Sequence, residues 1–287
     1  DVAVKPTGLT GGKGVRVTGD QLTKAEAQTY IRESQYEEWV IEERLVGEEF
    51  TLQALVADGD LRVTPAVQDH KRAFEGDQGP NTGGMGSYSD ATYTLPFLRE
   101  DEYEQAVDVL QQTVEALPSY RGVLYGQFML TAQGPKVVEF NARFGDPEAM
   151  NTLPVLETPL IDVLVAAREG DPLPELEFAR KATVCKYAVP AGYPTDPKAG
   201  AKVTVAEDTI GDGLLFYASV DAREDGIYTT TSRSFAVVGV ADTIGEAETI
   251  AESALLDVGD GFHIRHDIGK AGLIEQRIEH MNELRGS

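Results

Sequence analysis

A short polar run at residues 137–148 constrains the fold more than any other feature of the chain. It reads V-V-E-F-N-A-R-F-G-D-P-E. Two β-branched residues lead into a predicted strand, and a strand sends alternate side chains to one face, so Glu139, Asn141 and Arg143 form a row. Carboxylate and amide oxygens suit Mg²⁺, and a guanidinium matches phosphate oxygens, which indicates a floor that handles phosphate. An ordinary strand with polar residues facing solvent explains the same alternation.

Length and cysteine content limit the class of protein. The 287 residues are enough for two domains or for a large and a small one. The sequence has no apolar run long enough for a membrane span, and its start has neither a basic leader nor a Met. We therefore expect a soluble cytoplasmic protein whose numbering begins within a longer chain. The single cysteine, Cys185, excludes an internal disulfide and is interpreted as a buried structural thiol.

The charge balance excludes one class of partner. The chain carries 48 acidic and 25 basic residues, a formal net charge of -23. Such a surface repels nucleic-acid phosphates, so no nucleic-acid partner is expected. The acids are spread through the chain and lysines are fewer than arginines. An evenly acidic, lysine-poor surface leads to the hypothesis of a halophilic source.

A glycine-rich turn at residues 6–14 lies between two predicted strands. Glycines let backbone N–H groups approach an anion closely, and Lys5 and Lys13 flank them. The turn is a candidate phosphate lid. It is not a P-loop, because the G-x-x-x-x-G-K-[ST] order is absent and a strand follows. A tight hairpin with surface lysines is the alternative.

Periodicity and turn residues predict the other elements of the first 170 residues. Thr23 with Glu26 forms a capping box that opens a helix to about residue 34. Asp146-Pro147-Glu148 is predicted to open another helix whose N-terminus offers a polar-substrate site. Further strands are expected at residues 2–5, 15–17, 50–57, 61–67, 122–131 and 136–141, and further helices at residues 100–117 and 160–168.

Residues 68–86 are predicted to form a long polar connection without periodicity, which is usually a functional feature. His70, Lys71 and Arg72 would give it a cationic cluster suited to a phosphate. Beyond residue 170 the pattern changes to short strands and turns with no charged constellation that demands chemistry. Strands are expected there at residues 182–189, 201–205, 213–220, 227–231 and 234–241, and helices at residues 244–258 and 270–282.

Four runs in this order resemble the ATP-grasp ligases, and among them the archaeal-like phosphoribosylamine-glycine ligases. They are V-K-P-T-G-L-T-G-G-K-G-V (4–15), Q-D-H-K-R (68–72), G-P-N-T-G-G-M-G-S-Y-S (79–89) and E-F-N-A-R-F-G-D-P-E (139–148). The resemblance implies an α+β ATP-grasp fold with a partial lid subdomain (1–46), a large antiparallel-sheet subdomain (47–170) and a small β-rich C-terminal domain (171–287). The family's N-terminal domain has no counterpart in this sequence.

The resemblance also implies an activity. The family joins glycine to 5-phosphoribosylamine with ATP, by way of glycyl phosphate, in purine biosynthesis. It implies ATP and Mg²⁺ or Mn²⁺ as cofactors, small-molecule substrates and no membrane or nucleic-acid partner. Another ATP-grasp carboxylate-amine ligase, a carboxylase that uses bicarbonate, and a non-catalytic nucleotide-binding fragment are the alternatives.

Site residues follow from the resemblance, position by position. The metal would be held by Glu139, Asn141 and Gln127, with catalytic roles for Arg143, Lys71 and Asp146. ATP would contact Lys5, Gly11, Gly12, Lys13, Glu42, Glu43, Leu45 and Glu49. The other substrates would contact Arg72, Asn81, Thr82, Gly83, Gly84 and Glu148.

Overall fold

The computed structural model describes residues 1–8, 14–206, 208, 210–256, 258 and 261–286. The chain forms two compact units, Asp1–Val46 and Gly47–Ser287. Each unit contains its own sheet structure. No helix within the described ranges has both the length and the apolar composition that crossing a membrane requires.

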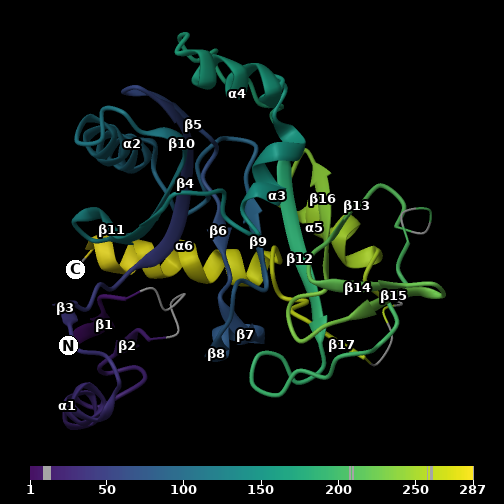
Figure 1. Cartoon of the computed structure of the whole chain (residues 1–287), viewed down its shortest axis with the longest axis horizontal. Helices are drawn as coiled ribbons and strands as arrows, with labels where there is room; N and C mark the ends of the chain where they lie inside the picture. Colours follow the sequence, from purple (N-terminus) through teal and green to yellow (C-terminus); the bar gives the residue numbers. More distant parts are fainter. Residues whose placement is uncertain (9–13, 207, 209, 257, 259–260, 287) are drawn as a thin grey trace. The chain divides into compact units, whose positions relative to one another are not determined.

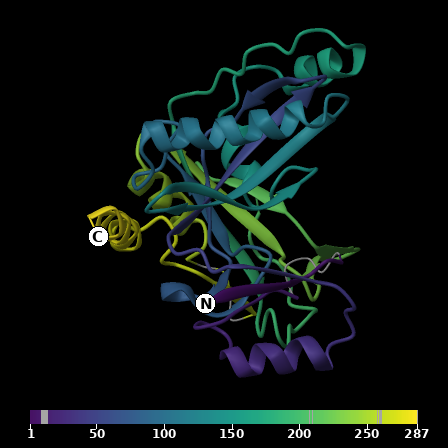
Figure 2. The ribbon, with the colours of Figure 1, turned by 90° about the vertical axis from the view of Figure 1, so that its left-hand side faces the viewer.

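The smaller unit is a three-stranded antiparallel sheet with one helix. The strand order is β2 (Arg16–Val17), β1 (Val2–Pro6), β3 (Trp39–Glu43), and α1 (Lys24–Glu33) is the purple helix of Figure 2. The Thr23 hydroxyl accepts a hydrogen bond from the Glu26 N–H at 3.3 Å, and the Glu26 carboxylate accepts one from the Thr23 N–H at 2.7 Å. The predicted capping box is confirmed, and it fixes where α1 begins.

Two hairpins make the first sheet of the larger unit, in the order β11-β10-β4-β5. All neighbouring pairs are antiparallel. The strands expected at residues 50–57, 122–131 and 136–141 are confirmed, whereas the strand expected at 61–67 ends at Val63. The first hairpin turns at Asp58 and Gly59, which have φ values of 50° and 91°. The strands are β4 (Glu48–Ala57), β5 (Asp60–Val63), β10 (Arg121–Thr131) and β11 (Gly134–Asn141).

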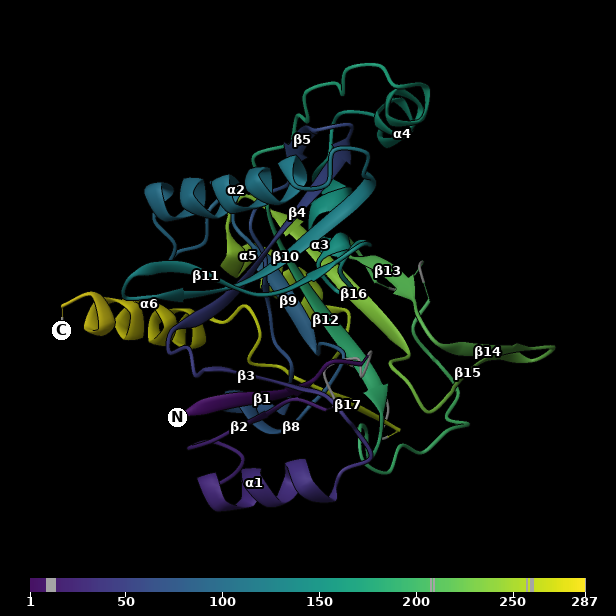
Figure 3. The same cartoon turned by 60° about the vertical axis from the view of Figure 1, so that its left-hand side comes forward.

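Helix α2 (Glu100–Glu115) covers one face of this sheet (Figure 3). Its buried apolar residues Ala106, Leu110 and Val114 recur every four positions, which places them on one side of the helix. Acidic residues occupy its first turn, where the helix dipole favours negative charge. The amphipathic pattern therefore accounts for both the helix and the face that it buries.

The prediction of one irregular connection over residues 68–86 is wrong. The segment contains β6 (Gln68–Asp69), β7 (Arg72–Phe74), the 3₁₀ turn η1 (Glu75–Asp77), β8 (Gln78–Asn81) and β9 (Gly86–Ser89). Strands of two to four residues are too short to show an alternating apolar and polar pattern in the sequence. In addition, β9 pairs with a strand about a hundred positions later. A Cβ at Gly86 would lie 2.3 Å from the Cys185 carbonyl oxygen, so the pairing requires glycine.

That partner, β12 (Ala182–Pro190), is central to a sheet of order β13-β16-β12-β9-β6, and β17 also pairs with it. Figure 1 shows β12 and β16 side by side, with α5 (Ile244–Ser253) against them. The strand expected at residues 201–205 is only one bridge, between Lys202 and Tyr228. The other strands are β13 (Leu214–Tyr217), β14 (Val220–Arg223), β15 (Gly226–Thr229), β16 (Phe235–Ala241) and β17 (Phe262–Ile264).

Strands from both sides of residue 170 therefore share this sheet. The subdomain limits expected at 47–170 and 171–287 stay a prediction. In the structure, residues 47–287 form one compact unit. Helix α4 (Leu160–Glu169) lies close to its predicted range and ends at Gly170, whose φ of +82° is the left-handed conformation that glycine adopts readily.

The helix predicted to open at Asp146-Pro147 is a single turn, α3 (Ala149–Thr152), followed by η2 (Leu153–Val155). Its residue Asn151 is fully buried and donates to Thr183 Oγ1 on β12 at 3.0 Å. The Asn151 side chain of this turn is thus already bound to the rest of the fold. A helix of four residues is also too short to have a substantial dipole. The expected helix is only one turn long, and the polar-substrate site expected at its N-terminus stays a prediction.

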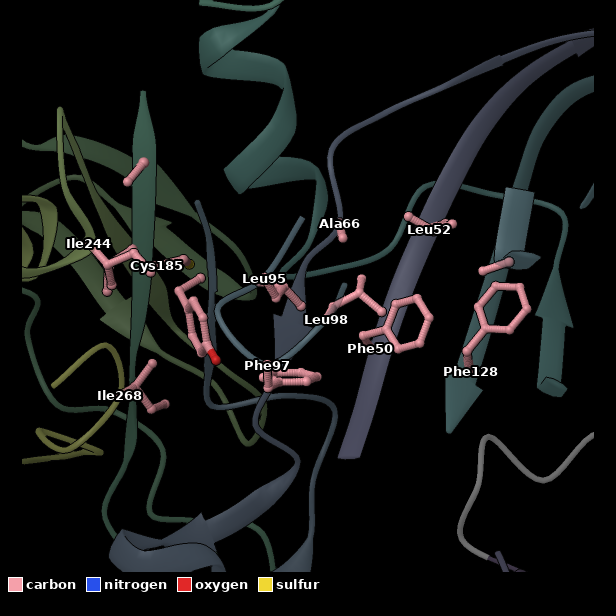
Figure 4. Packing of buried hydrophobic residues seen from close by; sticks show 14 of the residues in the cluster. Phe50, Leu52, Ala66, Leu95, Phe97, Leu98, Phe128, Cys185, Ile244 and Ile268 are labelled. Carbon is pink, nitrogen blue, oxygen red and sulfur yellow. The ribbon is translucent and has the colours of Figure 1, made fainter. Parts of the chain in front are cut away.

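The core runs between the two sheets of the larger unit (Figure 4). Phe50 on β4 stacks on Phe128 on β10 with ring centroids 5.3 Å apart. Cys185 on β12 is fully buried and unpaired, as predicted, and burial raises the pKa of its thiol. Apolar burial of this extent is the main stabilising contribution to the unit.

Buried charges, which the sequence reading of residues 171–287 did not anticipate, join the C-terminal part to η1. Arg265 is fully buried. Its Nε and Nη2 donate to the two carboxylate oxygens of Asp267 at 2.9 and 2.6 Å, and its Nη1 donates to Asp77 Oδ1 at 2.7 Å and to the Arg72 carbonyl at 3.2 Å. One guanidinium therefore fixes the backbone next to Lys71.

Helix α6 (Ala271–Gly286) extends this set of ion pairs. Arg277 pairs with Asp77, and its Nε lies 3.2 Å from Glu48 Oε2. His280 Nδ1 lies 2.5 Å from Glu48 Oε1, and the His280 side chain is 39% exposed. The C-terminal helix is thereby tied to the first residue of β4.

Candidate active site

The β10–β11 hairpin carries two of the three polar side chains of the predicted row, Glu139 and Asn141, but not Arg143. In its register Gln127 is the partner of Glu139. Asn141 Nδ2 donates to Glu139 Oε1 at 3.1 Å, and Glu139 is exposed. Arg143 lies beyond the end of the strand, is exposed, and donates to the Phe144 carbonyl at 2.8 Å. The fold thus gathers Gln127, Glu139 and Asn141 at one edge of the sheet.

Glu49 connects this row to the segment that follows β6. Its Oε2 accepts hydrogen bonds from Gln127 Nε2 at 2.5 Å and from Lys71 Nζ at 3.2 Å. Burial lowers the pKa of Lys71, but the charges of Glu49, Asp69 and Glu139 outweigh burial, and the pKa is raised overall. Lys71 is therefore a permanent cation surrounded by an excess of carboxylates.

Hydrogen bonds hold the end of β8 against Lys71. The Thr82 N–H and hydroxyl both donate to the Lys71 carbonyl, at 2.7 and 2.8 Å, and the hydroxyl accepts from the Gly84 N–H at 3.0 Å. Arg72 Nη1 donates to the Gly79 carbonyl at 2.9 Å. These contacts bring together the predicted substrate-binding residues Arg72, Asn81, Thr82, Gly83 and Gly84.

His70 does not join the predicted cationic cluster. Only 2% of its surface is exposed, and its Nδ1 lies 3.5 Å from Asp77 Oδ1. Burial lowers the pKa of His70, which favours the neutral ring at neutral pH. Its Nε2 is buried without a hydrogen-bond partner among the described residues. The expected cluster of three cations is therefore reduced to Lys71 and Arg72.

Two carboxyl groups lie inside the site. Glu148 is buried, and its Oε1 accepts hydrogen bonds from the Tyr125 hydroxyl at 2.8 Å and from the Thr51 hydroxyl at 3.2 Å. Asp69 has one carboxylate oxygen without a hydrogen-bond partner in the described part of the chain. Burial and the neighbouring Glu148 raise the pKa of Asp69 well above its ordinary range. An additional cation at this place would be favoured electrostatically.

Asp146 is held by residues from the C-terminal sheet. Arg233 Nη2 donates to Asp146 Oδ2 at 2.9 Å, while Arg233 Nη1 donates to the carbonyls of Asp146 at 3.2 Å and Gly84 at 3.1 Å. The Tyr187 hydroxyl donates to Asp146 Oδ1 at 2.7 Å, and the Arg233 guanidinium lies over the Tyr187 ring at 4.5 Å. Both carboxylate oxygens of Asp146 therefore have protein partners.

The smaller unit carries the other predicted nucleotide contacts. Lys5 on β1 forms an ion pair with Glu42 on the neighbouring strand β3. Glu43 is exposed at the end of β3, and Leu45 is half-buried just beyond it. The predicted lid residues Gly11, Gly12 and Lys13 lie outside the described residues.

Comparison with known proteins identifies the family. The model of the phosphoribosylglycinamide synthetase ATP-grasp (A) domain matches residues 1–149. The model of the C domain of the same enzyme matches residues 183–271. The chain belongs to the phosphoribosylglycinamide synthetase family. The resemblance drawn from the four sequence runs is confirmed.

Relatives in this family cover the whole chain. Phosphoribosylamine-glycine ligase of Methanosarcina barkeri is 56% identical over 295 residues, which make up 100% of this chain and 67% of the relative. That of Methanopyrus kandleri is 50% identical over 303 residues, 99% of this chain and 68% of the relative. The chain thus spans about two thirds of the length of these phosphoribosylglycinamide synthetase relatives.

Solved structures confirm the predicted α+β ATP-grasp fold. Phosphoribosylamine-glycine ligase of Thermotoga maritima has a TM-score of 0.78 and 28% identity, covering 93% of this chain and 68% of that chain. The biotin carboxylase domain of Hydrogenobacter thermophilus 2-oxoglutarate carboxylase has a TM-score of 0.68 at 14% identity, over 98% of this chain and 60% of that chain. The second likeness shows the fold alone.

Several residues of the candidate site were not predicted from sequence. Asp69 lies inside the Q-D-H-K-R run, so the motif itself offered the signal. Arg233 and Tyr187 gave no such signal, because they meet Asp146 from 87 and 41 positions away. Only the sheet built by β12 and β16 brings them to the site.

Proposed function

We propose that the chain carries the ATP-dependent ligation of glycine to 5-phosphoribosylamine, which forms glycinamide ribonucleotide, ADP and phosphate. The observation that supports this most directly is the row of Gln127, Glu139 and Asn141 next to the Glu49–Lys71 pair, in a chain of this family. The names of its relatives state the same activity. Purine biosynthesis in the cytoplasm is the corresponding setting.

The donor set fits a divalent cation of the magnesium type. The described residues contain no group of three or more His, Cys, Asp or Glu side chains arranged as a closed metal cage. Mg²⁺ needs no such cage, because it commonly binds one or two carboxylates together with waters and substrate phosphates. Glu139 and Asn141 would hold Mg²⁺ or Mn²⁺, and Gln127 would add a ligand if its amide released Glu49. The bound ion would supply neutralising charge for the ATP phosphates.

The first chemical step is transfer of the γ-phosphoryl group to glycine. A glycine carboxylate oxygen attacks the γ-phosphorus, the bond to ADP breaks, and glycyl phosphate forms. Negative charge moves between oxygens, and fixed cations stabilise that charge without reorganising. Arg143, exposed beyond the end of β11, and Lys71, held by Glu49, would provide those cations.

The second step forms the amide. The amine nitrogen of phosphoribosylamine attacks the carbonyl carbon of glycyl phosphate, and the bond to phosphate breaks. Arg72 and the residues at the end of β8, Asn81, Thr82, Gly83 and Gly84, would bind the ribose phosphate. Asp146 and Glu148 would provide negative charge for the glycine ammonium group. The protein partners already bound to both side chains favour orientation of glycine over proton transfer.

The nucleotide contacts are proposed residue by residue, as the resemblance implies. Lys5, Gly11, Gly12 and Lys13 would contact the phosphates, Glu42, Glu43 and Leu45 the adenine edge, and Glu49 the ribose hydroxyls. The Lys5–Glu42 ion pair supports this only in part, since it shows that these two side chains already lie together.

A Glu139→Gln variant tests the proposal. The full-length protein is assayed for ADP release with ATP, Mg²⁺, glycine and freshly generated phosphoribosylamine. Loss of a metal-binding carboxylate should lower turnover by about 100-fold or more, since metal stabilisation is worth several kcal/mol and each ~1.4 kcal/mol is tenfold. Glu104→Gln is the matched control, because Glu104 is also an exposed acid and lies on α2.

The fold should be unchanged in both variants, since both positions are exposed. Equal ADP release by Glu139→Gln and the wild type would remove Glu139 from the metal site. ADP release that needs bicarbonate in place of glycine would instead indicate a carboxylase. Absence of MgATP binding in the wild type would indicate a non-catalytic domain.

A further inference from the structure

Arg233 joins two segments to which the proposed function assigns different substrates. One is the end of the β8–β9 connection, where the Gly84 carbonyl accepts from Arg233 Nη1 at 3.1 Å. The other is the Asp146-Pro147 segment, where both the backbone carbonyl and the carboxylate of Asp146 accept from Arg233. A planar guanidinium offers several donors in fixed directions, so it fixes the separation of these segments better than an ammonium group does.

The packing around Arg233 leaves little freedom. A Cβ at Gly83 would lie 3.3 Å from Arg233 Cζ. A Cβ at Gly84 would lie 2.6 Å from Pro147 Cδ, so the two segments touch where Arg233 binds them. Gly84 has a φ of +106°, which side chains rarely adopt. The Arg233 side chain itself is only 14% exposed.

Tyr187 supports Arg233 from below the guanidinium. Its ring lies 4.5 Å from Arg233 Cζ, and its hydroxyl donates to the second oxygen of Asp146 at 2.7 Å. Tyr187 is buried on β12. Arg233 is therefore supported by β12, a strand that follows, in the sequence, both of the segments that Arg233 joins.

We propose that Arg233 is a positioning residue that keeps the amine-binding segment at Gly83–Gly84 and the acyl-binding segment at Asp146 in register. The inference rests on the proposed function. Glycyl phosphate has two fates: attack by the ribosylamine nitrogen forms the C–N bond and releases phosphate, whereas attack by water returns glycine and phosphate. Correct register favours the amine, since small misplacements of reactants cost large factors in rate.

The expected signature is uncoupling of ATP consumption from product formation. In the wild-type full-length protein, one ADP should form per glycinamide ribonucleotide. In Arg233→Met the ratio of ADP to product should rise at least threefold, while the affinity for MgATP stays within twofold of wild type. Arg233→Lys should give an intermediate ratio, because it keeps the charge and loses the planar fork.

Arg223 provides a matched control in the same region of the chain. It also lies over a tyrosine, with Cζ 4.2 Å from the Tyr228 ring, and its Nε lies 2.9 Å from Asp221 Oδ2. It differs in being half exposed and in lying on the β14–β15 hairpin. Arg223→Met should keep the ratio at one.

The outcomes separate the hypotheses. If the rates of ADP release and product formation fall equally in Arg233→Met, the ratio of ADP to product stays at one. That result would overturn the positioning role and leave a structural one. If Arg233→Met does not fold, Arg233→Lys and Tyr187→Phe decide by the same ratio, and a ratio of one in both overturns the proposal. A wild-type protein without glycine-dependent ADP release would refute the proposed function instead.

Discussion

Arg265 offers a quantitative test of how the C-terminal part stabilises the larger unit. Its side chain is fully buried and makes hydrogen bonds to Asp267, Asp77 and the Arg72 carbonyl. Replacement by Met keeps most of the volume and removes every donor. Asp77 retains Arg277 and His70 as partners, but the Asp267 carboxylate retains, within the described part of the chain, only the hydrogen bond from the Gly76 N–H at 2.9 Å.

The expected cost follows from the carboxylate left behind. Removing one partner of a buried ion pair typically costs about 3 to 5 kcal/mol, because the other charge stays buried and uncompensated. For a unit of this size, each kcal/mol lowers the melting temperature by roughly 2 to 4 °C. Arg265→Met should therefore lower the melting temperature by at least about 6 °C, and urea unfolding should give the same loss. Arg223→Met, an exposed pair, should lose less than ~1 kcal/mol.

The pH dependence distinguishes this explanation from simple loss of packing. Burial raises the pKa of Asp267, but hydrogen bonds from Arg265 and the Gly76 N–H outweigh burial and lower it overall. The pKa of Asp77 is also lowered, because His70, Arg277 and Arg265 outweigh burial. A depressed carboxyl pKa contributes stability that is present above the unfolded pKa of about 3.9 and is lost as pH falls.

In Arg265→Met that contribution is weakened, so the difference in unfolding free energy between variant and wild type should shrink between pH 7 and about pH 3. Adding Asp267→Asn to Arg265→Met should recover part of the lost stability, since it removes the uncompensated charge. A difference that is the same at both pH values, or a double variant whose losses simply add, would refute the electrostatic reasoning.

Two further predictions concern the core and the surface. Phe128→Ala should cost about 3 to 5 kcal/mol in urea unfolding, because the fully buried ring stacks on Phe50 and leaves a cavity; a loss under 1 kcal/mol would contradict this packing. If the hypothesis of a halophilic source is right, the net charge of -23 should make the melting temperature rise between about 0.1 and 1 M KCl, over which the Debye length falls from ~10 to ~3 Å; equal stability at both concentrations would count against it.

Local signals predicted the elements whose partners are close in sequence. The capping box of Thr23 and Glu26 gave the start of α1 within a residue, because the two side chains that form it are three positions apart. The strands of the β10–β11 hairpin were predicted from local patterns, but the pairing of Gln127 with Glu139 depends on a register shift between Gln127 and Phe128 that no local pattern shows. Glu139 and Asn141 of the candidate metal row were therefore readable from sequence, although the occupancy of the row stays a prediction.

Elements whose partners are distant in sequence were missed. Strand β6 has two residues and β9 has four, and β9 takes shape by pairing with β12. His70 reads as a cation beside Lys71 and Arg72, yet its backbone pairs with Gly86 and its ring is buried against Asp77. Neither the strand pairing nor the burial leaves a periodic trace, so no local rule could have placed them.

The same long-range pairing explains why the two halves of the chain depend on each other. Asp146, Gly84 and the Arg72 carbonyl belong to the segments that the four sequence runs identify. The groups that hold them, Arg233, Tyr187 and Arg265, all come from residues 183–271, which match the C domain. Side chains of that region therefore contact the candidate site in the ATP-grasp part. A chain cut between the two matched regions would lose the hydrogen bonds made by Arg233, Tyr187 and Arg265, even if each half kept its secondary structure.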